Sequence, residues 1–152
     1  TVRIKSMAVV HDQLYRFYNV SEIDISEYFH HLLSGLNALM GGRSGDYVID
    51  IQADEYKMDV DIALLCGLIV SEMVANAFKH GFKGHKEGLI NVDFKVKEGK
   101  RILTVTNTGN RMPENVLEIK TSSLGMSLIK TFTTQLGGKL ELHAENGLQI
   151  TF

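Results

Sequence analysis

The sequence predicts an α+β fold of two layers, in which helices cover one face of a mixed, mainly antiparallel sheet. Two observations support this prediction. Apolar residues recur at helical spacing through most of the chain up to about residue 80, and from residue 90 onward they alternate with polar residues in hairpin-joined segments. With 152 residues, of which 44% are hydrophobic, the chain can bury one core of domain size.

The first part of the chain predicts two helices. From about Val2 to Phe17, apolar side chains fall at helical spacing. Asp24, followed three residues later by Glu27, has the pattern of a capping box. It opens a second helix, which we expect to end at the glycine pair 41–42.

A strand and a third helix follow. Residues 47–51 alternate apolar and polar side chains, as in a half-buried strand. The helix runs from about Val60 to His80 and stops at Gly81, a residue suited to a left-handed cap. Its first half is apolar nearly all round and should lie in the core. The only cysteine, Cys66, belongs to this half and cannot form an internal disulfide, which suits a reducing cytoplasm.

The second half of the chain has the alternation of paired strands. We expect strands at 90–96, 101–106, 139–143 and 148–152 and one helix at about 124–136. Residues 97–100 (KEGK) look like the turn of the first hairpin, and the turn of the last hairpin lies around Asn146. A polar loop with the only proline, Pro113, separates the first hairpin from the helix.

Charge and hydropathy exclude some classes of function. A net charge of −2 gives no general attraction to nucleic acid or to anionic membranes. The uncharged apolar run Ile62–Ser71 is too short to span a bilayer, and no leader sequence opens the chain. Because Thr1 already lies within a helical pattern, we expect a piece of a longer protein, located in the cytoplasm.

The end of the third helix carries a polar stripe. Glu72, Asn76 and His80 fall at four-residue steps, and Lys79 lies on the same side. A carboxylate and an amide oxygen one turn apart suit a hard cation such as Mg²⁺, with water and phosphate completing its shell. A solvated stripe on a surface helix is the alternative, and these residues alone do not decide between the two.

Two glycine-bearing loops come later in the chain. Residues 106–111 (TNTGNR) leave a strand, and residues 122–126 (SSLGM) open a helix. A helix N-terminus offers unpaired N–H groups and the positive end of its dipole to phosphate. Each loop taken alone is a weak signal, because glycines after strands are usually turns.

Taken in order, these segments resemble the ATP-binding domain shared by histidine kinases, gyrase, Hsp90 and MutL. Residues 72–80 (EMVANAFKH) are similar to the N-box, 106–113 (TNTGNRMP) to the first glycine box and 122–130 (SSLGMSLIK) to the second. Residues 3–15 (RIKSMAVVHDQLY) resemble the linker helix of the HWE/HisKA-like sensor histidine kinases, and 23–29 (IDISEYF) continue that match.

The resemblance implies an architecture and an activity. Residues 21–152 would be the catalytic domain with the Bergerat ATP-binding fold of the GHKL proteins, and residues 1–20 the end of the dimerisation and phosphoacceptor helices. The domain would transfer the γ-phosphoryl group of ATP, with Mg²⁺, to a histidine upstream of Thr1. The implied partners are that upstream helix, a response regulator and a second copy in a homodimer.

The resemblance also implies roles for individual residues. Asn76 would hold Mg²⁺ through its amide oxygen, and Glu72 would act as a base or orient a metal-bound water. Further nucleotide contacts would come from Lys79, His80, Asn107, Gly109, Met112, Ser123, Leu124, Gly125 and Met126. Residues 112–121 would form a short lid over the nucleotide.

Three positions depart from the family pattern. The aspartate that reads adenine is Asn107, the second glycine of the first glycine box is Arg111, and a threonine after the late glycine is Leu148. An amide oxygen still accepts a hydrogen bond from the adenine amino group, but without a charge behind it. Two alternatives therefore stay open: a degenerate signalling scaffold (a pseudokinase) and a serine kinase of the anti-sigma-factor type. The linker helix argues against the second alternative, because those proteins lack it.

Overall fold

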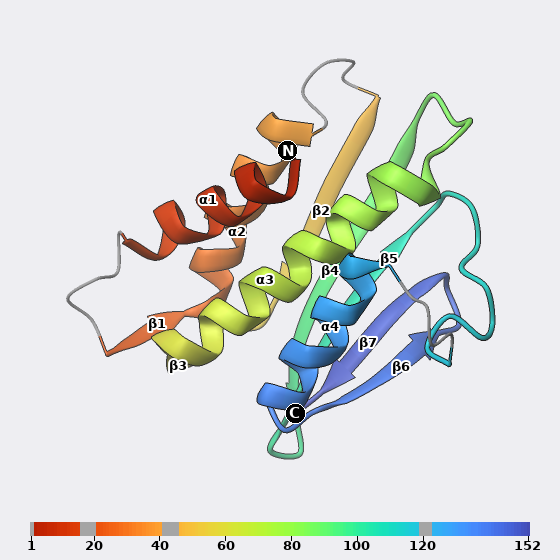
Figure 1. Ribbon diagram of the computed structural model, residues 1–152. Coiled ribbons are helices and arrows are strands. Elements are labelled where there is room, and N and C mark those ends of the chain that lie inside the picture. The colour runs from red at the N-terminus through yellow and green to blue at the C-terminus, as the bar shows by residue number, and fades with distance from the viewer. Residues whose placement is uncertain (1, 16–20, 41–45, 119–122) are drawn as a thin grey trace.

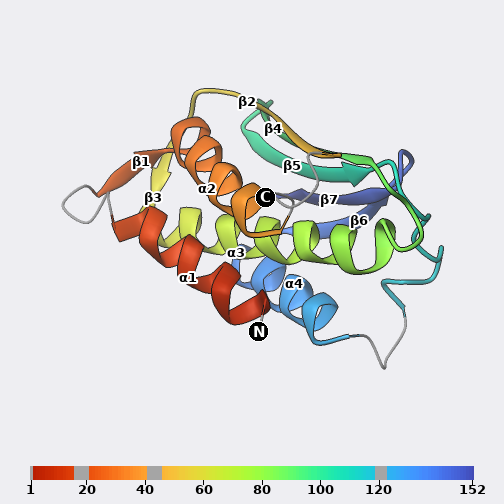
Figure 2. The same ribbon diagram turned by 90° about the horizontal axis from the view of Figure 1, so that it is seen from above.

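The computed structural model describes residues 2–15, 21–40, 46–118 and 123–152. They form two layers, with a five-stranded sheet on one side and helices on the other (Figures 1 and 2). This arrangement confirms the predicted α+β fold.

The sheet is mixed and mainly antiparallel, as predicted. Its strands are β2 (Tyr47–Ala53), β4 (Gly88–Lys97), β5 (Lys100–Asn107), β6 (Lys139–His143) and β7 (Gly147–Thr151). They lie in the order β2-β4-β5-β7-β6, in which β2 pairs in parallel with β4 and every other neighbour is antiparallel. The β4–β5 hairpin turns at Glu98 (φ 53°) and Gly99 (φ 76°), two left-handed positions that match the twist of the strands.

Three helices cover one face of the sheet and a fourth lies outside them. The helices are α1 (Val2–Tyr15), α2 (Ile25–Met40), α3 (Val60–Asn76) and α4 (Leu124–Gln135). Figure 2 shows α2, α3 and α4 beneath the sheet, with α1 packed on α2 and α3. The predicted extension of the first helix to Phe17 and the predicted end of the second at 41–42 lie outside the described residues.

The core is built around α3. Cys66, Ile69 and Val70 of this helix are fully buried, as are Phe94 and Leu103 of the sheet. Burial raises the pKa of the Cys66 thiol to about 12, because a thiolate would lose its hydration there. The stretch Val60–Gly81 is long and apolar enough to cross a membrane by length and composition. Its hydropathy is explained by its place as the central helix of the domain.

Local capping follows the sequence at two helix ends. The Asp24 carboxylate accepts a hydrogen bond from the Glu27 N–H (3.1 Å), which confirms the predicted start of α2. At the end of α4, Gly137 takes a left-handed φ of 68°, and the Gly138 N–H donates to the Thr133 carbonyl (3.0 Å). The sequence did not predict β1 (Glu22–Asp24) and β3 (Lys57–Asp59), an antiparallel pair whose strands are too short to show alternation.

The prediction of a left-handed cap at Gly81 was wrong. The helix ends in a π-helical turn, η1 (Ala77–Gly81), in which the Phe82 N–H donates to the Ala77 carbonyl (2.8 Å). Among these residues the positive φ belongs to Gly84 (86°) instead. Glycine is needed at 81 for space, because a Cβ there would lie 2.8 Å from the side-chain oxygen of Asn107.

Candidate nucleotide-binding site

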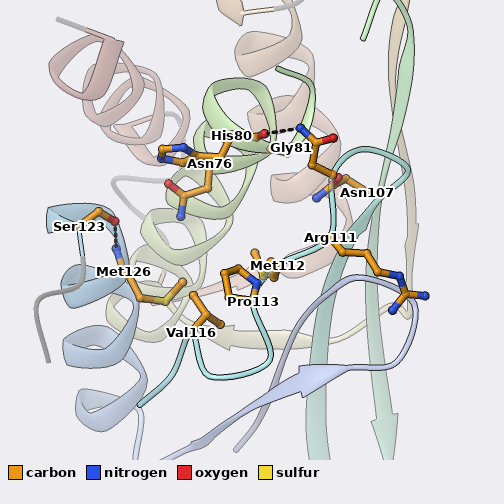
Figure 3. A pocket seen from close by; sticks show the side chains of 12 residues that line it. Asn76, His80, Gly81, Asn107, Arg111, Met112, Pro113, Val116, Ser123 and Met126 are labelled. Carbon is orange, nitrogen blue, oxygen red and sulfur yellow. Dashed lines mark hydrogen bonds between the residues drawn. The ribbon is translucent and has the colours of Figure 1, made fainter. Parts of the chain in front are cut away.

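A cavity of about 330 Å³ lies between the end of α3, the loop after β5 and the start of α4 (Figure 3). The three segments that the sequence singled out therefore meet at one place. The predicted site residues that line this cavity are Asn76, His80, Asn107, Met112, Ser123 and Met126. A volume of this size with one polar end is typical of a small-ligand site.

The apolar part of the wall was only partly predicted. Ala77, Pro113 and Val116 line the cavity beside the methionines Met112 and Met126. Figure 3 shows Met112, Pro113 and Val116 together on the segment after β5, facing Met126 of α4. Methionine side chains adapt their shape to a flat ring, so this wall suits a planar base.

The opposite end of the cavity is polar and includes a helix N-terminus. Ser123 caps α4, its hydroxyl accepting a hydrogen bond from the Met126 N–H (3.3 Å). The remaining N–H groups of the first turn, which include those of Leu124 and Gly125, have no helical acceptor. Asn76 lies beside this turn, because its Oδ1 would be 3.2 Å from a Cβ at Gly125, and no acidic residue occupies the first turn of α4. A helix N-terminus of this kind favours phosphate.

Other predicted site residues lie beside the cavity rather than on its wall. Lys79 is exposed, and Leu124 is 60% exposed. Gly109 and Gly125 provide space: a Cβ at Gly109 would collide with the carbonyl of Gly81, and one at Gly125 would lie 2.9 Å from the Glu72 carboxylate. Both glycines therefore let backbone segments approach closely.

Asn107 is held by its own loop. Its side-chain oxygen Oδ1 accepts a hydrogen bond from the Gly109 N–H (2.9 Å) and has a longer contact (3.4 Å) with the side-chain nitrogen of Asn146. The amide nitrogen Nδ2 of Asn107 has no acceptor among the described residues. The predicted adenine-reading position therefore lines the cavity with its oxygen already engaged.

Asn146 is a positioning residue that the sequence presented only as part of a turn. It lies between β6 and β7 with a left-handed φ of 68°. Its Oδ1 accepts from the Met112 N–H (2.9 Å), and its Nδ2 donates to the carbonyls of Asn107 and Asn110 (both 3.1 Å). These bonds fix the loop that forms one side of the cavity.

Asn110 ties the same loop to the end of the third helix. Its Nδ2 donates to the carbonyls of His80 (3.2 Å) and Lys83 (3.0 Å), and its Oδ1 lies 2.9 Å from Nε2 of His85. The His80 bond is the upper dashed line in Figure 3. Loop and helix therefore hold a fixed spacing across the cavity.

A family model described as "Histidine kinase-, DNA gyrase B-, and HSP90-like ATPase" matches residues 61–152, which include every residue that lines the cavity. The chain belongs to this ATPase family. A second model, described as "Histidine kinase", matches residues 1–40. The two matches agree with the resemblances of the N-box, the glycine boxes and the linker helix.

Individual relatives agree with this assignment. The chain is 27% identical over 121 residues to the blue-light-activated histidine kinase 2 of Erythrobacter litoralis, a match that covers 79% of this chain and 34% of that protein. The chain thus spans about a third of the length of this relative.

Solved structures show the same fold. The histidine kinase domain of the blue-light-activated kinase EL346 of Erythrobacter litoralis superimposes with a TM-score of 0.84, at 23% identity over 98% of this chain and 77% of that one. The nucleotide-free catalytic domain of the histidine kinase ThkA gives 0.64, at 21% identity over 86% of this chain and 91% of that one.

In this ATPase domain, the acid of the N-box pairs with α1. Glu72 is only 4% exposed, and both its carboxylate oxygens accept from Arg3: Nε to Oε1 at 2.9 Å and Nη2 to Oε2 at 3.3 Å. Glu72 lies behind Gly125 and does not line the cavity. The ion pair therefore joins the N-box to the segment matched by the histidine kinase model.

The three departures from the family pattern have unequal consequences in this ATPase domain. The Arg111 side chain extends away from the other labelled residues of the cavity (Figure 3). Leu148 is 1% exposed in the core side of β7 and does not line the cavity. Asn107 and Arg111 both line the cavity, and of the two the Asn107 side chain is the one held against its wall.

Proposed function

We propose that this domain binds ATP together with Mg²⁺ and supplies the γ-phosphoryl group to a histidine on a helix upstream of this chain. The observation that carries the proposal is the cavity itself. One end combines Asn76, Ser123 and the N-terminus of α4, and the rest has an apolar wall with Asn107 at its edge. A nucleotide has the matching polarity, with phosphates at one end and a flat base at the other.

The phosphate end fits Mg²⁺ and phosphate oxygens. The amide oxygen of Asn76 is a hard ligand, and water and phosphate would complete the octahedral shell, with Mg²⁺ neutralising the phosphate charge. The N–H groups of Leu124 and Gly125, with the exposed Lys79 and His80 nearby, would hold the phosphates in place. Phosphoryl transfer depends mainly on this kind of positioning and charge neutralisation.

Glu72 keeps its proposed role in orienting a metal-bound water or accepting a proton. That role requires Arg3 to release one carboxylate oxygen, because both oxygens are engaged by the guanidinium. In the paired state Glu72 acts as a positioning residue, since its carboxylate borders Gly125 at the start of α4.

The surrounding protein is proposed from the same family. Residues 1–20 would be the end of the dimerisation and phosphoacceptor helices and residues 21–152 the catalytic domain, in a cytoplasmic homodimer that serves a response regulator. The match of residues 1–40 to the histidine kinase model and the packing of α1 on α2 and α3 support this organisation. The linker-helix match also favours a histidine kinase over a serine kinase of the anti-sigma-factor type.

Calorimetric titration with ADP and ATP, with and without Mg²⁺, tests the proposal. The wild-type chain should bind both nucleotides more tightly with Mg²⁺, and Asn76→Ala should abolish that Mg²⁺ dependence. Asn91→Ala, an exposed asparagine on β4 outside the cavity wall, is the matched control and should bind like wild type. If the wild-type chain binds neither nucleotide at millimolar concentration, the signalling-scaffold alternative, which the change at Asn107 favours, takes its place.

A further inference from the structure

The orientation of the Asn107 amide is fixed by its neighbours. The Gly109 N–H points at one atom of this amide from 2.9 Å, and a backbone N–H can meet only an acceptor. That atom is therefore the oxygen Oδ1. A reversed amide would bring two N–H groups face to face and lose the hydrogen bond.

The contacts of Asn146 independently indicate the same orientation of the Asn107 amide. Because its own Oδ1 accepts from the Met112 N–H (2.9 Å), its nitrogen must be the atom that approaches Asn107. That nitrogen lies 3.1 Å from the Asn107 carbonyl and 3.4 Å from Oδ1. Both neighbours thus present donors to Asn107, and both require the oxygen on the loop side.

With Oδ1 on the loop side, the nitrogen Nδ2 of Asn107 faces the cavity. Figure 3 shows it on the side of Asn107 that faces the cavity. No acceptor for it occurs among residues 2–15, 21–40, 46–118 and 123–152. Gly81 packs closely on this side chain, because a Cβ at Gly81 would lie 2.8 Å from Oδ1 of Asn107. The cavity therefore offers a fixed donor at the position where the family pattern has an acceptor.

We propose that this cavity reads the purine base through a hydrogen bond donated by Asn107, so that a 6-oxopurine nucleotide binds at least as tightly as an adenine nucleotide. Guanine and hypoxanthine carry an oxygen at C6, which accepts from an N–H donor. Adenine carries an amino group at C6, which is itself a donor. This inference rests on the proposed nucleotide-binding function and names the base that the site takes.

Adenine can meet the donor only in a shifted position. Its ring nitrogen N1 accepts a hydrogen bond, but the exocyclic amino group then needs another acceptor. The apolar part of the wall, which includes Met112, Val116 and Met126, offers only weak thioether acceptors from its side chains. A buried donor without a partner lowers affinity more than a neutral hydrogen bond raises it.

Comparison of ADP with IDP tests the inference, because the two bases differ only in the C6 substituent and the protonation of N1. Both are titrated calorimetrically with Mg²⁺ at one pH and salt concentration. Wild type should bind IDP at least as tightly as ADP. In Asn107→Asp, an oxygen replaces Nδ2 while the Gly109 N–H keeps its acceptor. The dissociation constant of IDP divided by that of ADP should therefore rise by about tenfold.

Asn91→Asp is the control, since it adds the same negative charge on an exposed residue of β4 outside the cavity wall. It should leave the ratio unchanged. If wild type binds ADP clearly more tightly than IDP, the inference is wrong, but the proposed nucleotide-binding function is retained. This comparison needs no variant. An unchanged ratio in a folded Asn107→Asp protein overturns it as well. If wild type binds neither nucleotide, the proposed nucleotide-binding function is wrong, and the inference that rests on it is wrong as well.

Discussion

Replacing Arg3 by methionine should destabilise the domain through Glu72. Methionine keeps most of the apolar stem of the arginine and removes only the guanidinium. The substitution leaves the Glu72 carboxylate without its partner. Water cannot replace that partner, because the Glu72 side chain is only 5% exposed. The two segments that the pair connects are α1 and the N-box part of α3.

The size of the effect follows from burial. Removing one partner of a fully buried ion pair costs about 3–5 kcal/mol. The Arg3 side chain is 34% exposed, so solvent screens its charge and the value falls to about 2 kcal/mol. Urea unfolding followed by circular dichroism should show this loss as a midpoint lower by about 1 M, for a slope of about 2 kcal/mol per M.

A double-mutant cycle separates the pair from other effects. Glu72→Gln removes the charge that Arg3 compensates, so Arg3→Met should cost much less in that background. Lys5→Met, an exposed position on the same helix, controls for the loss of a positive charge and should change stability by less than about 0.5 kcal/mol. Equal effects of Arg3→Met with and without Glu72→Gln would refute the reasoning.

Three further predictions concern the loop and the core. Gly109→Ala should lower the free energy of unfolding by about 3 kcal/mol in urea titrations, because its Cβ would collide with the Gly81 carbonyl; an effect below about 1 kcal/mol would contradict the close backbone approach. Tyr28→Phe should leave stability unchanged or raise it by up to about 1 kcal/mol, since the buried Tyr28 hydroxyl has no hydrogen-bond partner within the described residues; a clear loss in thermal unfolding would reveal such a partner. Cys66 should react with thiol reagents only through unfolding, because burial raises its pKa from 9.0 to about 12. The unfolded thiol ionises first, so the Cys66 contribution to stability should fall as the pH rises from about 9 to 12, and Cys66→Ala should reduce that fall in urea titrations across this range.

The sequence predicted those parts of the fold that local patterns specify. Alternation marked β4 and β5, and the Asp24 cap fixed the start of α2, because each signal lies within a few residues. The π-helical turn η1 was not predictable in this way. Its geometry depends on Gly81 fitting against Asn107, which comes from a distant strand.

The candidate site was predicted to a similar extent. The three boxes located the walls, and Asn76, His80 and Ser123 do line the cavity. Arg3 and Asn146 were missed as site-forming residues, because their partners lie 69 and 34 residues away along the chain. Neither has a local pattern that would distinguish it from a surface arginine or a turn asparagine.

Asn107 shows how a substitution can reverse the sense of a hydrogen bond. The sequence allows an asparagine to accept from adenine in place of an aspartate, since the amide still has an oxygen. A carboxylate has two acceptor atoms, so one can serve the loop while the other faces the base. An amide has only one, and in this fold the Gly109 N–H engages it at 2.9 Å. The atom that remains for the ligand is therefore a donor, so the change from acid to amide replaces an acceptor at this position by a donor rather than merely weakening the acceptor.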